Sequence, residues 1–374
     1  MICMDAFLAN DWEKYSELRS SWLSLLGSIP HPSPFLDPDL CRLWMESYNP
    51  SGSPLAVGVE QSGGLSGLAP LSLNRISRFG IELDRLQFMV SVPWLDSDLL
   101  YQSDGEPETT IALDSALDLS GADMVELSGI PVSSATATSL ERYASRRGLM
   151  FDILYSDSWS SSGINLVGEW PDYLKQRSSK TRYNVRRSTR RVESAGKVGV
   201  QRVTAQDNVR EVKSIVSEII QDSWKDPGSY SREGFWTGLV ELMHRNDWLD
   251  LHVLSISGDP SSFVLLLRYG DTAYAMQTAY VANYSNLSPG IYILTSVLER
   301  YFREKPVRRL DFITSYPYLR KLSNYTRGRL KLRLLPLSLR GALLKSFRRY
   351  QEMRSDQITR FKSTDDLYSR INSD

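Results

Sequence analysis

Cysteine is scarce in this chain of 374 residues, which contains two, Cys3 and Cys41. Two cysteines cannot form the several disulfides that stabilise small secreted folds, so the composition favours a reducing compartment. Histidine is equally sparse, because His31, His244 and His252 are far apart and lack the spacing of metal ligands. These absences predict a protein without a disulfide framework and without a bound metal.

Long apolar segments are also missing. No run reaches the ~18–20 residues that span a bilayer, and residues 1–10 lack the pattern of a secretory signal. The chain has no Gly-x-Ser-x-Gly elbow, no Walker loop and no dinucleotide-binding fingerprint, so those chemistries are set aside. We therefore expect a cytoplasmic protein.

Charge is balanced overall but divided unevenly along the chain. Residues 1–150 contain 9 Lys and Arg against 20 Asp and Glu, whereas the remainder contains 35 against 24. This asymmetry suggests two domains of opposite charge, with an anionic ligand attracted to the basic half. A chance partition is the alternative. The length independently favours two domains.

Apolar periodicity and turn signals predict alternating helices and strands in both halves. The first half has a hairpin turn at Gln61-Ser-Gly-Gly64, and the polar stretch 156–163 marks a domain boundary. In the second half, helices are expected at 170–195, 206–222, 232–246 and 291–303, and strands at 249–257, 262–269, 272–280 and 309–313.

Four segments carry a likeness to a known family. They are Pro34-Phe35 with 36–44, Gly64-Leu-Ser-Gly-Leu-Ala-Pro-Leu71, the basic stretch from Tyr173 to Gly196, and Ser288-Pro-Gly290 before a helix. In order and spacing they resemble the CelD-type and FemAB-like acetyltransferase families, in which two GNAT-like domains are fused. The likeness covers roughly residues 10–335.

The resemblance implies an α/β fold of two tandem GNAT-like domains, with mixed sheets flanked by helices. It places an N-terminal domain at 1–160, a C-terminal domain with the donor site at 165–336, and a basic amphipathic tail at 337–374. It implies transfer of an acyl group, most simply acetyl from acetyl-CoA, to an amine or hydroxyl of a sugar or cell-envelope or exopolysaccharide precursor, with no metal. The chain departs from the family after Asp311, where Ser315 replaces a common Gly and Leu319 a common Lys.

Ser288, Pro289, Gly290, Ile291 and Tyr292 form a loop that opens a helix. Helix-terminal N–H groups and the positive end of the helix dipole suit a pyrophosphate, and in a GNAT fold that of CoA would bind there. The alternative is an ordinary helix start capped by Ser288.

A run of cations, including Lys180, Arg182 and Arg186, precedes Glu193 without an intervening carboxylate. Like charges at i,i+4 destabilise a helix by ~0.2–0.5 kcal/mol per pair, so something should offset them. Either a phosphate-bearing ligand or carboxylates of the acidic half could offset this charge, and the sequence does not decide between them. Tyr173 and Tyr183 flank the run and permit base or sugar stacking, but no DNA-recognition fold is evident and we expect no DNA binding.

Acyl transfer needs a base, an acid and a polarised carbonyl, for which a strand N–H serves in a GNAT fold. Asp311 is the expected base and Tyr318 the expected acid, with Tyr284 a further candidate and Gln277 lining the acceptor pocket. For each tyrosine, packing with a satisfied hydroxyl is the alternative.

Trp94, Asp96 and Asp98 share a loop, and the family's Asp-rich loop makes them candidates for binding the acceptor. The segment 337–350 has apolar residues on one helical face and cations elsewhere, as in helices that lie on anionic membranes. Docking on the second domain is the alternative. Membrane contact would place the protein at the inner face of the membrane with a lipid-linked acceptor.

Two rival functions remain. A FemAB-type transferase using aminoacyl-tRNA would suit the basic helix, although the long helical arm of those enzymes is not evident. A non-catalytic member that binds a ligand or acts as a scaffold would suit the altered residues after Asp311.

Overall fold

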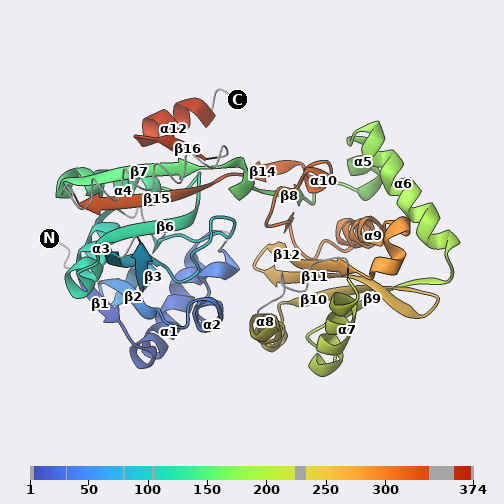
Figure 1. Ribbon diagram of the computed structural model, residues 1–374, viewed down its shortest axis with the longest axis horizontal. Helices are drawn as coiled ribbons and strands as arrows, with labels where there is room; N and C mark the ends of the chain where they lie inside the picture. The colour runs from blue at the N-terminus through green and yellow to red at the C-terminus, as the bar shows by residue number, and fades with distance from the viewer. Residues whose placement is uncertain are drawn as a thin grey trace. The chain divides into compact units, whose positions relative to one another are not determined.

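The computed structural model describes residues 4–30, 32–78, 81–102, 106–223, 233–336 and 358–371. The chain divides into two compact units (Figure 1). Residues Met1–Ser160 and Arg327–Asp374 form the first unit, and Ser161–Thr326 form the second. The second unit is therefore an insertion in the first. None of the helices in these ranges combines the length and hydropathy that a membrane crossing requires.

The first unit contains a mixed sheet in the order β1-β2-β3-β4-β6-β15-β7-β16, with β5 beside β3. The strands are β1 (Met4–Ala9), β2 (Ser53–Gln61), β3 (Gly64–Arg78), β4 (Ile81–Phe88), β5 (Leu100–Tyr101), β6 (Met124–Pro131), β7 (Leu149–Tyr155), β15 (Arg329–Pro336) and β16 (Thr359–Phe361). The helices are α1 (Trp12–Ser28), α2 (Pro38–Tyr48), α3 (Glu106–Ser120), α4 (Thr136–Arg147) and α12 (Thr364–Ile371).

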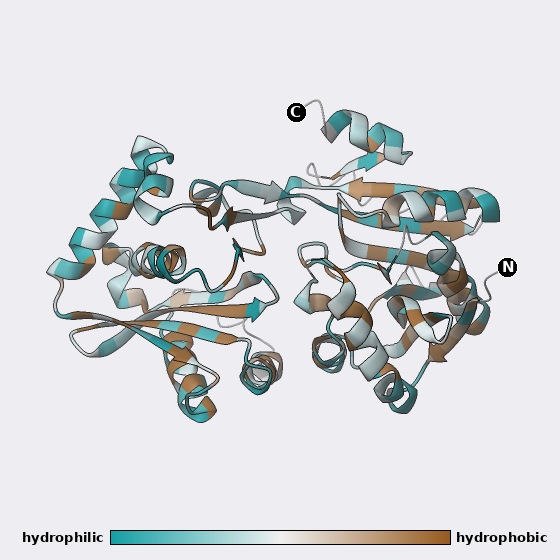
Figure 2. Cartoon of the chain, turned by 180° about the vertical axis from the view of Figure 1, so that it is seen from behind, coloured by the Kyte–Doolittle hydropathy of each residue, from teal (hydrophilic) through white to brown (hydrophobic). Residues whose placement is uncertain are grey.

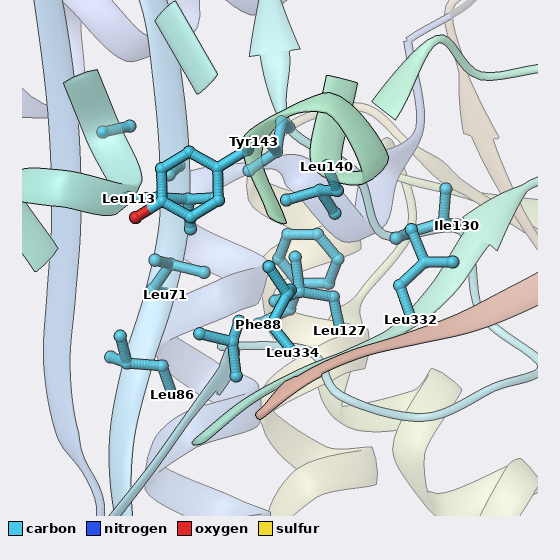
Figure 3. Close-up of a cluster of buried hydrophobic side chains, with 14 of the residues drawn as sticks. Leu71, Leu86, Phe88, Leu113, Leu127, Ile130, Leu140, Tyr143, Leu332 and Leu334 are labelled. Carbon is cyan, nitrogen blue, oxygen red and sulfur yellow. The ribbon is translucent and has the colours of Figure 1, made fainter. Parts of the chain in front are cut away.

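The hairpin between β2 and β3 confirms the predicted turn. Ser62 and Gly63 have φ of 53° and 82°, the paired positive values that suit the twist of a tight hairpin. Strands β4 and β6 run parallel, and α3 connects them. Leucines and aromatic rings from the sheet, α3 and α4 interdigitate to form the core of this unit (Figure 3).

The second unit contains a sheet in the order β14-β8-β13-β12-β11-β10-β9. The strands are β8 (Ser161–Asn165), β9 (Val198–Thr204), β10 (Leu249–Ile256), β11 (Asp259–Tyr269), β12 (Thr272–Tyr280), β13 (Arg309–Asp311) and β14 (Tyr325–Arg327). The helices are α5 (Trp170–Lys175), α6 (Ser179–Ser194), α7 (Val209–Gln221), α8 (Glu233–Arg245), α9 (Pro289–Glu304) and α10 (Pro317–Arg320), with the 3₁₀ helix η4 (Ala282–Leu287) before α9. Helix α9 covers one face of the sheet, and α7 and α8 cover the other (Figure 1).

Three details differ from the sequence-based expectations. The helix expected at 170–195 is two helices, because the Ser178 hydroxyl accepts the Thr181 amide at 3.2 Å and starts α6 anew. Strand β13 ends at Asp311 rather than Ile313, since Ile313 has φ of 64° and its amide donates to the Asp311 carboxylate. Strand β15, expected in the second domain, pairs with β6 and β7 in the first unit. The amphipathic segment 337–350 lies outside the described residues.

Candidate functional site

The second unit contains a fork between two parallel strands. β12 pairs with β13 only from Thr272–Arg309 to Tyr274–Asp311. Beyond that point β12 continues to Tyr280, and in the described part of the chain no strand pairs with residues 275–280 on that side. In the described part of the chain, the main-chain N–H and C=O groups of residues 275–279 on that edge have no strand partner, whereas an isolated bridge between Ser223 and Val281 closes the end of the edge. Residues 275–278 are half-buried.

A β-bulge lies where β12 leaves β13. The pairing with β11 shifts between Leu265–Gln277 and Leu266–Ala275, which leaves Met276 as the extra residue. A bulge bends its strand and redirects its N–H groups, and bulges are over-represented next to active sites. Gln277 lies beyond the end of the pairing with β13, and its role in lining an acceptor pocket stays a prediction.

The start of α9 lies beside the end of β12. A Cβ atom placed on Gly290 would be 3.6 Å from Cδ1 of Tyr280. Ser288 occupies the N-cap position with φ of 60°, but its side chain does not cap the helix. Its carbonyl accepts the amides of Ile291 and Tyr292 at 3.1 and 3.3 Å. These two amides, expected to be free for a phosphate, therefore already have an acceptor.

Helix α6 packs against this loop through its buried face. That face consists of Thr181, Val185, Ser188 and Val192. The Ser188 hydroxyl donates to the Ser288 carbonyl at 2.9 Å, and Arg191 donates to the Asn286 carbonyl at 2.8 Å. The basic helix is thus joined to the loop before α9. Neither contact had a recognisable signal in the sequence, because both end on main-chain carbonyls.

The remaining cations of α6 face solvent, and the helix is largely hydrophilic (Figure 2). Lys180, Arg186, Arg187 and Arg190 are exposed, and none forms an ion pair with any residue in the described ranges. Arg182 differs, since its guanidinium donates to the carbonyls of Lys175 and Arg177 and so terminates α5.

Asp311 lies at the apex of the fork and is 1% exposed. Its carboxylate accepts the Ile313 amide at 2.6 Å, the Tyr325 phenol at 3.0 Å and the Ser161 hydroxyl at 3.2 Å. These donors link β8, β13 and β14. Because these hydrogen bonds join three strands, the geometry favours a structural role for Asp311, and its role as a base stays a prediction.

Tyr318 lies on α10, and its ring is parallel to that of Tyr316, with centroids 6.2 Å apart. Burial raises the pKa of the Tyr318 phenol, and the phenols of Tyr316 and Tyr280 raise it further. Tyr318 is therefore a protonated donor at neutral pH, near the ring of Tyr280. Tyr284 in η4 is half-buried and packs against the apolar core of the unit.

Trp94, Asp96 and Asp98 lie in the first unit. Asp96 is 3% exposed and forms ion pairs with Arg327 and with Arg329, the latter at 2.6 Å. These ion pairs give Asp96 a structural role. The pair Arg327-Gly-Arg329 is the sequence feature that could have indicated it, because buried guanidinium groups require carboxylates.

The same loop fills the fork between β4 and β6, the counterpart of the fork in the second unit. The Ser97 amide donates to the Gly129 carbonyl at 3.1 Å, and its hydroxyl donates to the Val90 carbonyl at 2.6 Å. Gly129 has φ of 92°, and a Cβ there would lie 2.1 Å from the Leu95 carbonyl oxygen. The open fork of the second unit is therefore the better candidate for a ligand.

Residues 179–320 match the family model of the acetyltransferase (GNAT) domain. The match begins at α6 and ends at α10, so it contains the whole fork. Both units join parallel strands through a helix beside such a fork. The chain has a tandem GNAT fold. No group of three or more potential metal-binding side chains occurs in its described ranges.

Solved structures show the same fold at low identity. A FemX crystal structure is 11% identical, with a TM-score of 0.58 over 84% of this chain and 95% of that chain. The C-terminal domain of a putative lysylphosphatidylglycerol synthetase from Agrobacterium fabrum is 12% identical, with a TM-score of 0.52 over 89% and 95%. A Bacteroides thetaiotaomicron protein of unknown function is 8% identical, with a TM-score of 0.52 over 90% and 100%. None of the curated proteins matches the sequence.

Proposed function

We propose that the second unit transfers an acyl group, most simply acetyl, from acyl-CoA to an amine or hydroxyl acceptor. The open edge of β12 beyond Tyr274 carries this proposal, because an extended pantetheine arm can pair with that edge as an added strand. The bulge at Met276 would aim a main-chain N–H at the thioester carbonyl.

The chemistry requires few side chains. The acceptor nitrogen or oxygen attacks the thioester carbonyl carbon, and the new bond forms as the C–S bond breaks. Tyr318, whose raised pKa keeps it protonated, donates its proton to the leaving thiolate. The proton lost by the acceptor passes to solvent and returns to the phenolate. Correct placement of the two reactants provides much of the acceleration.

The CoA phosphates would lie at the start of α9. The Gly290 backbone approaches Tyr280 there, and the helix dipole favours negative charge. The Ser188–Ser288 hydrogen bond joins α6 to this loop, so the exposed cations of α6 add positive charge near it. This arrangement supports a phosphate role for both segments, which the sequence suggested separately.

The acceptor is proposed to be a sugar or a lipid-linked envelope precursor. The parallel rings of Tyr316 and Tyr318 are 58% and 50% exposed, and such flat apolar surfaces suit a sugar ring. We place the reaction in the cytoplasm. Contact with the membrane through residues 337–350 stays part of this proposal.

A second candidate function is aminoacyl transfer from charged tRNA. The observation that favours it is the set of exposed, unpaired cations on α6, which a nucleic-acid backbone would neutralise. One of the proteins with the same fold is a putative lysylphosphatidylglycerol synthetase, whose product by that name is an aminoacylated lipid.

Calorimetric titration distinguishes the two donors. We expect acetyl-CoA and CoA to bind with micromolar affinity and an aminoacyl-tRNA to bind no better than uncharged tRNA. Binding of charged tRNA without binding of CoA would support the second candidate. Absence of binding to either would reject both donor assignments and favour a non-catalytic scaffold.

A further inference from the structure

A cavity lies in the second unit, beside the C-terminal half of α9 and away from the start of that helix. It has a volume of about 140 Å³ and lies between the C-terminal half of α9 and strands β9 and β10. Its walls are Val200, His252, Ser296, Glu299, Arg300 and Arg303. A cavity of this size holds several water molecules or one small polar molecule.

A buried charged cluster lies behind this cavity. Asp250 is fully buried, and Arg202 donates to both of its oxygens, at 2.8 and 2.9 Å. The Tyr301 phenol donates to the same carboxylate at 2.6 Å, and Arg268 lies 3.9 Å from it. Burial raises the pKa of Asp250, but the adjacent His252 ring and the hydrogen bonds from Arg202 and Tyr301 lower it more, so the carboxylate is ionised.

His252 connects the cluster to the cavity. It is 0% exposed, and Nε2 lies 3.1 Å from Oδ1 of Asp250. Neither ring nitrogen has a hydrogen bond of good geometry with any described residue. A buried polar atom without a partner costs about 1–3 kcal/mol, so an occupant of the cavity should contact this imidazole.

The cavity wall on α9 is cationic. Arg300 makes no hydrogen bond within the described residues, since its nearest carboxylate oxygen, on Glu304, is 3.7 Å away. Arg303 and Arg202 each form an ion pair with Glu304, in which a guanidinium nitrogen lies 3.4 Å from a carboxylate oxygen. Glu299 is the one carboxylate among the lining residues, so two guanidinium groups outnumber it.

We infer that this cavity binds a small oxyanion, a carboxylate or phosphate group. Arg300 and Arg303 donate to it from α9, and His252 donates from the floor of the cavity. Guanidinium groups match the geometry of carboxylate and phosphate oxygens. Nε2 of His252 lies 3.1 Å from Asp250, so Nδ1 is the ring nitrogen left to contact the anion. This site is independent of the acyltransfer proposal.

The first test follows the His252 ring by nitrogen-detected NMR during titration with sodium phosphate or sodium acetate. The chain has three histidines, so His31→Gln and His244→Gln assign the His252 signal by elimination. We expect a saturable shift of the His252 ring-nitrogen signals with phosphate or with acetate, and the anion that binds more tightly shows which oxyanion the cavity prefers. Sodium chloride at equal ionic strength is the control. A response equal to that of chloride would mean that the cavity holds only water, and would overturn the inference.

The second test changes the wall without touching the core. Arg300→Met removes a half-exposed cation, whereas Arg210→Met removes an exposed cation from α7, on the other face of the sheet. We expect Arg300→Met to weaken binding of the chosen anion at least about fivefold, and Arg210→Met to leave it unchanged. Equal affinity in both variants would overturn the assignment.

Discussion

The hydroxyl of Ser188 on α6 donates a 2.9 Å hydrogen bond to the main-chain carbonyl of Ser288, at the start of α9. This contact holds the basic helix against the proposed phosphate loop. Ser188→Ala removes a hydrogen bond with a net value of about 1 kcal/mol, so we expect about fivefold weaker CoA binding. Calorimetric titration measures the loss.

Thr189→Ala is the matched control for this prediction. The Thr189 hydroxyl donates to the Val185 carbonyl within α6 and does not reach the loop. The control should bind CoA as the wild type does. Equal affinities for all three proteins would show that the contact does not position the loop.

Gly290 provides a test of phosphate binding at α9. A Cβ there would make an ordinary contact with Tyr280, so substitutions should fold. We expect Gly290→Glu to weaken CoA binding at least about tenfold, because its carboxylate repels the phosphates, and the isosteric Gly290→Gln to lose much less. The difference should shrink at 1 M salt. If Glu and Gln behave alike, no anion binds beside Gly290.

Tyr318 is predicted to protonate the thiolate. Tyr318→Phe should lower kcat about 100-fold and leave KM for the donor nearly unchanged. Burial and two neighbouring phenols raise the pKa of Tyr318 above 10.0. Tyr318 should therefore stay protonated between pH 7 and 9, and the wild-type rate should not fall in this range through loss of its proton. Tyr316→Phe is the control from the same aromatic pair. Comparable losses in both variants would assign the pair to acceptor binding instead.

Much of the fold could be predicted from the sequence, because local signals specified it. The turn at Gln61-Ser-Gly-Gly64 and the strand order around β12 follow from periodicity and turn residues. The position of β15 did not follow. Residues 329–336 come directly after the second unit in sequence, yet they pair with β6 and β7. Long-range pairing of this kind leaves no periodic signal in a single sequence.

The candidate site could also be predicted only in part, because local sequence patterns do not show which distant segments make contact. The loop at Ser288 and the cations of α6 were recognised, but their contact through Ser188 was not. Asp96 was interpreted as an acceptor ligand because exposure cannot be read from residue type. In the structure it is buried against Arg329. His252 lacks the sequence spacing of a metal ligand. In the structure it is fully buried beside Asp250 and lines a cavity, which a sequence does not reveal.

Asp98 predicts a pH dependence for the first unit. Burial raises the pKa of its carboxyl to about 6, although Thr136 and the Leu99 amide donate to it. The folded state therefore holds a proton that the unfolded chain releases near pH 3.8. The free energy of unfolding should fall as pH rises from about 4 to about 6, then stay low.

Asp98→Asn should abolish this decline and unfold at higher urea concentration than the wild type at pH 7.5. Asp118→Asn is the control, because it removes an exposed carboxylate from α3 of the same unit. Urea unfolding at pH 4.5, 5.5 and 7.5 measures the effect. Parallel curves for the wild type and Asp98→Asn would contradict it.

Substitutions at Asp311 distinguish a structural role of its carboxylate from a catalytic one. In Asp311→Asn, Oδ1 can still accept the Ile313 amide, while the new amide nitrogen faces two hydroxyls that can reorient to accept it. We therefore expect a loss of about 1 kcal/mol in stability, with kcat within about threefold of the wild type. Asp311→Ala leaves the donors of β8, β13 and β14 unsatisfied and should cost about 3 kcal/mol. A general base would give another pattern, since Asn and Ala would both lower kcat by ~100-fold or more whatever their stability. Measuring urea unfolding and the pH profile of kcat/KM for both variants decides between the roles, because only removal of a base abolishes the acidic limb of that profile.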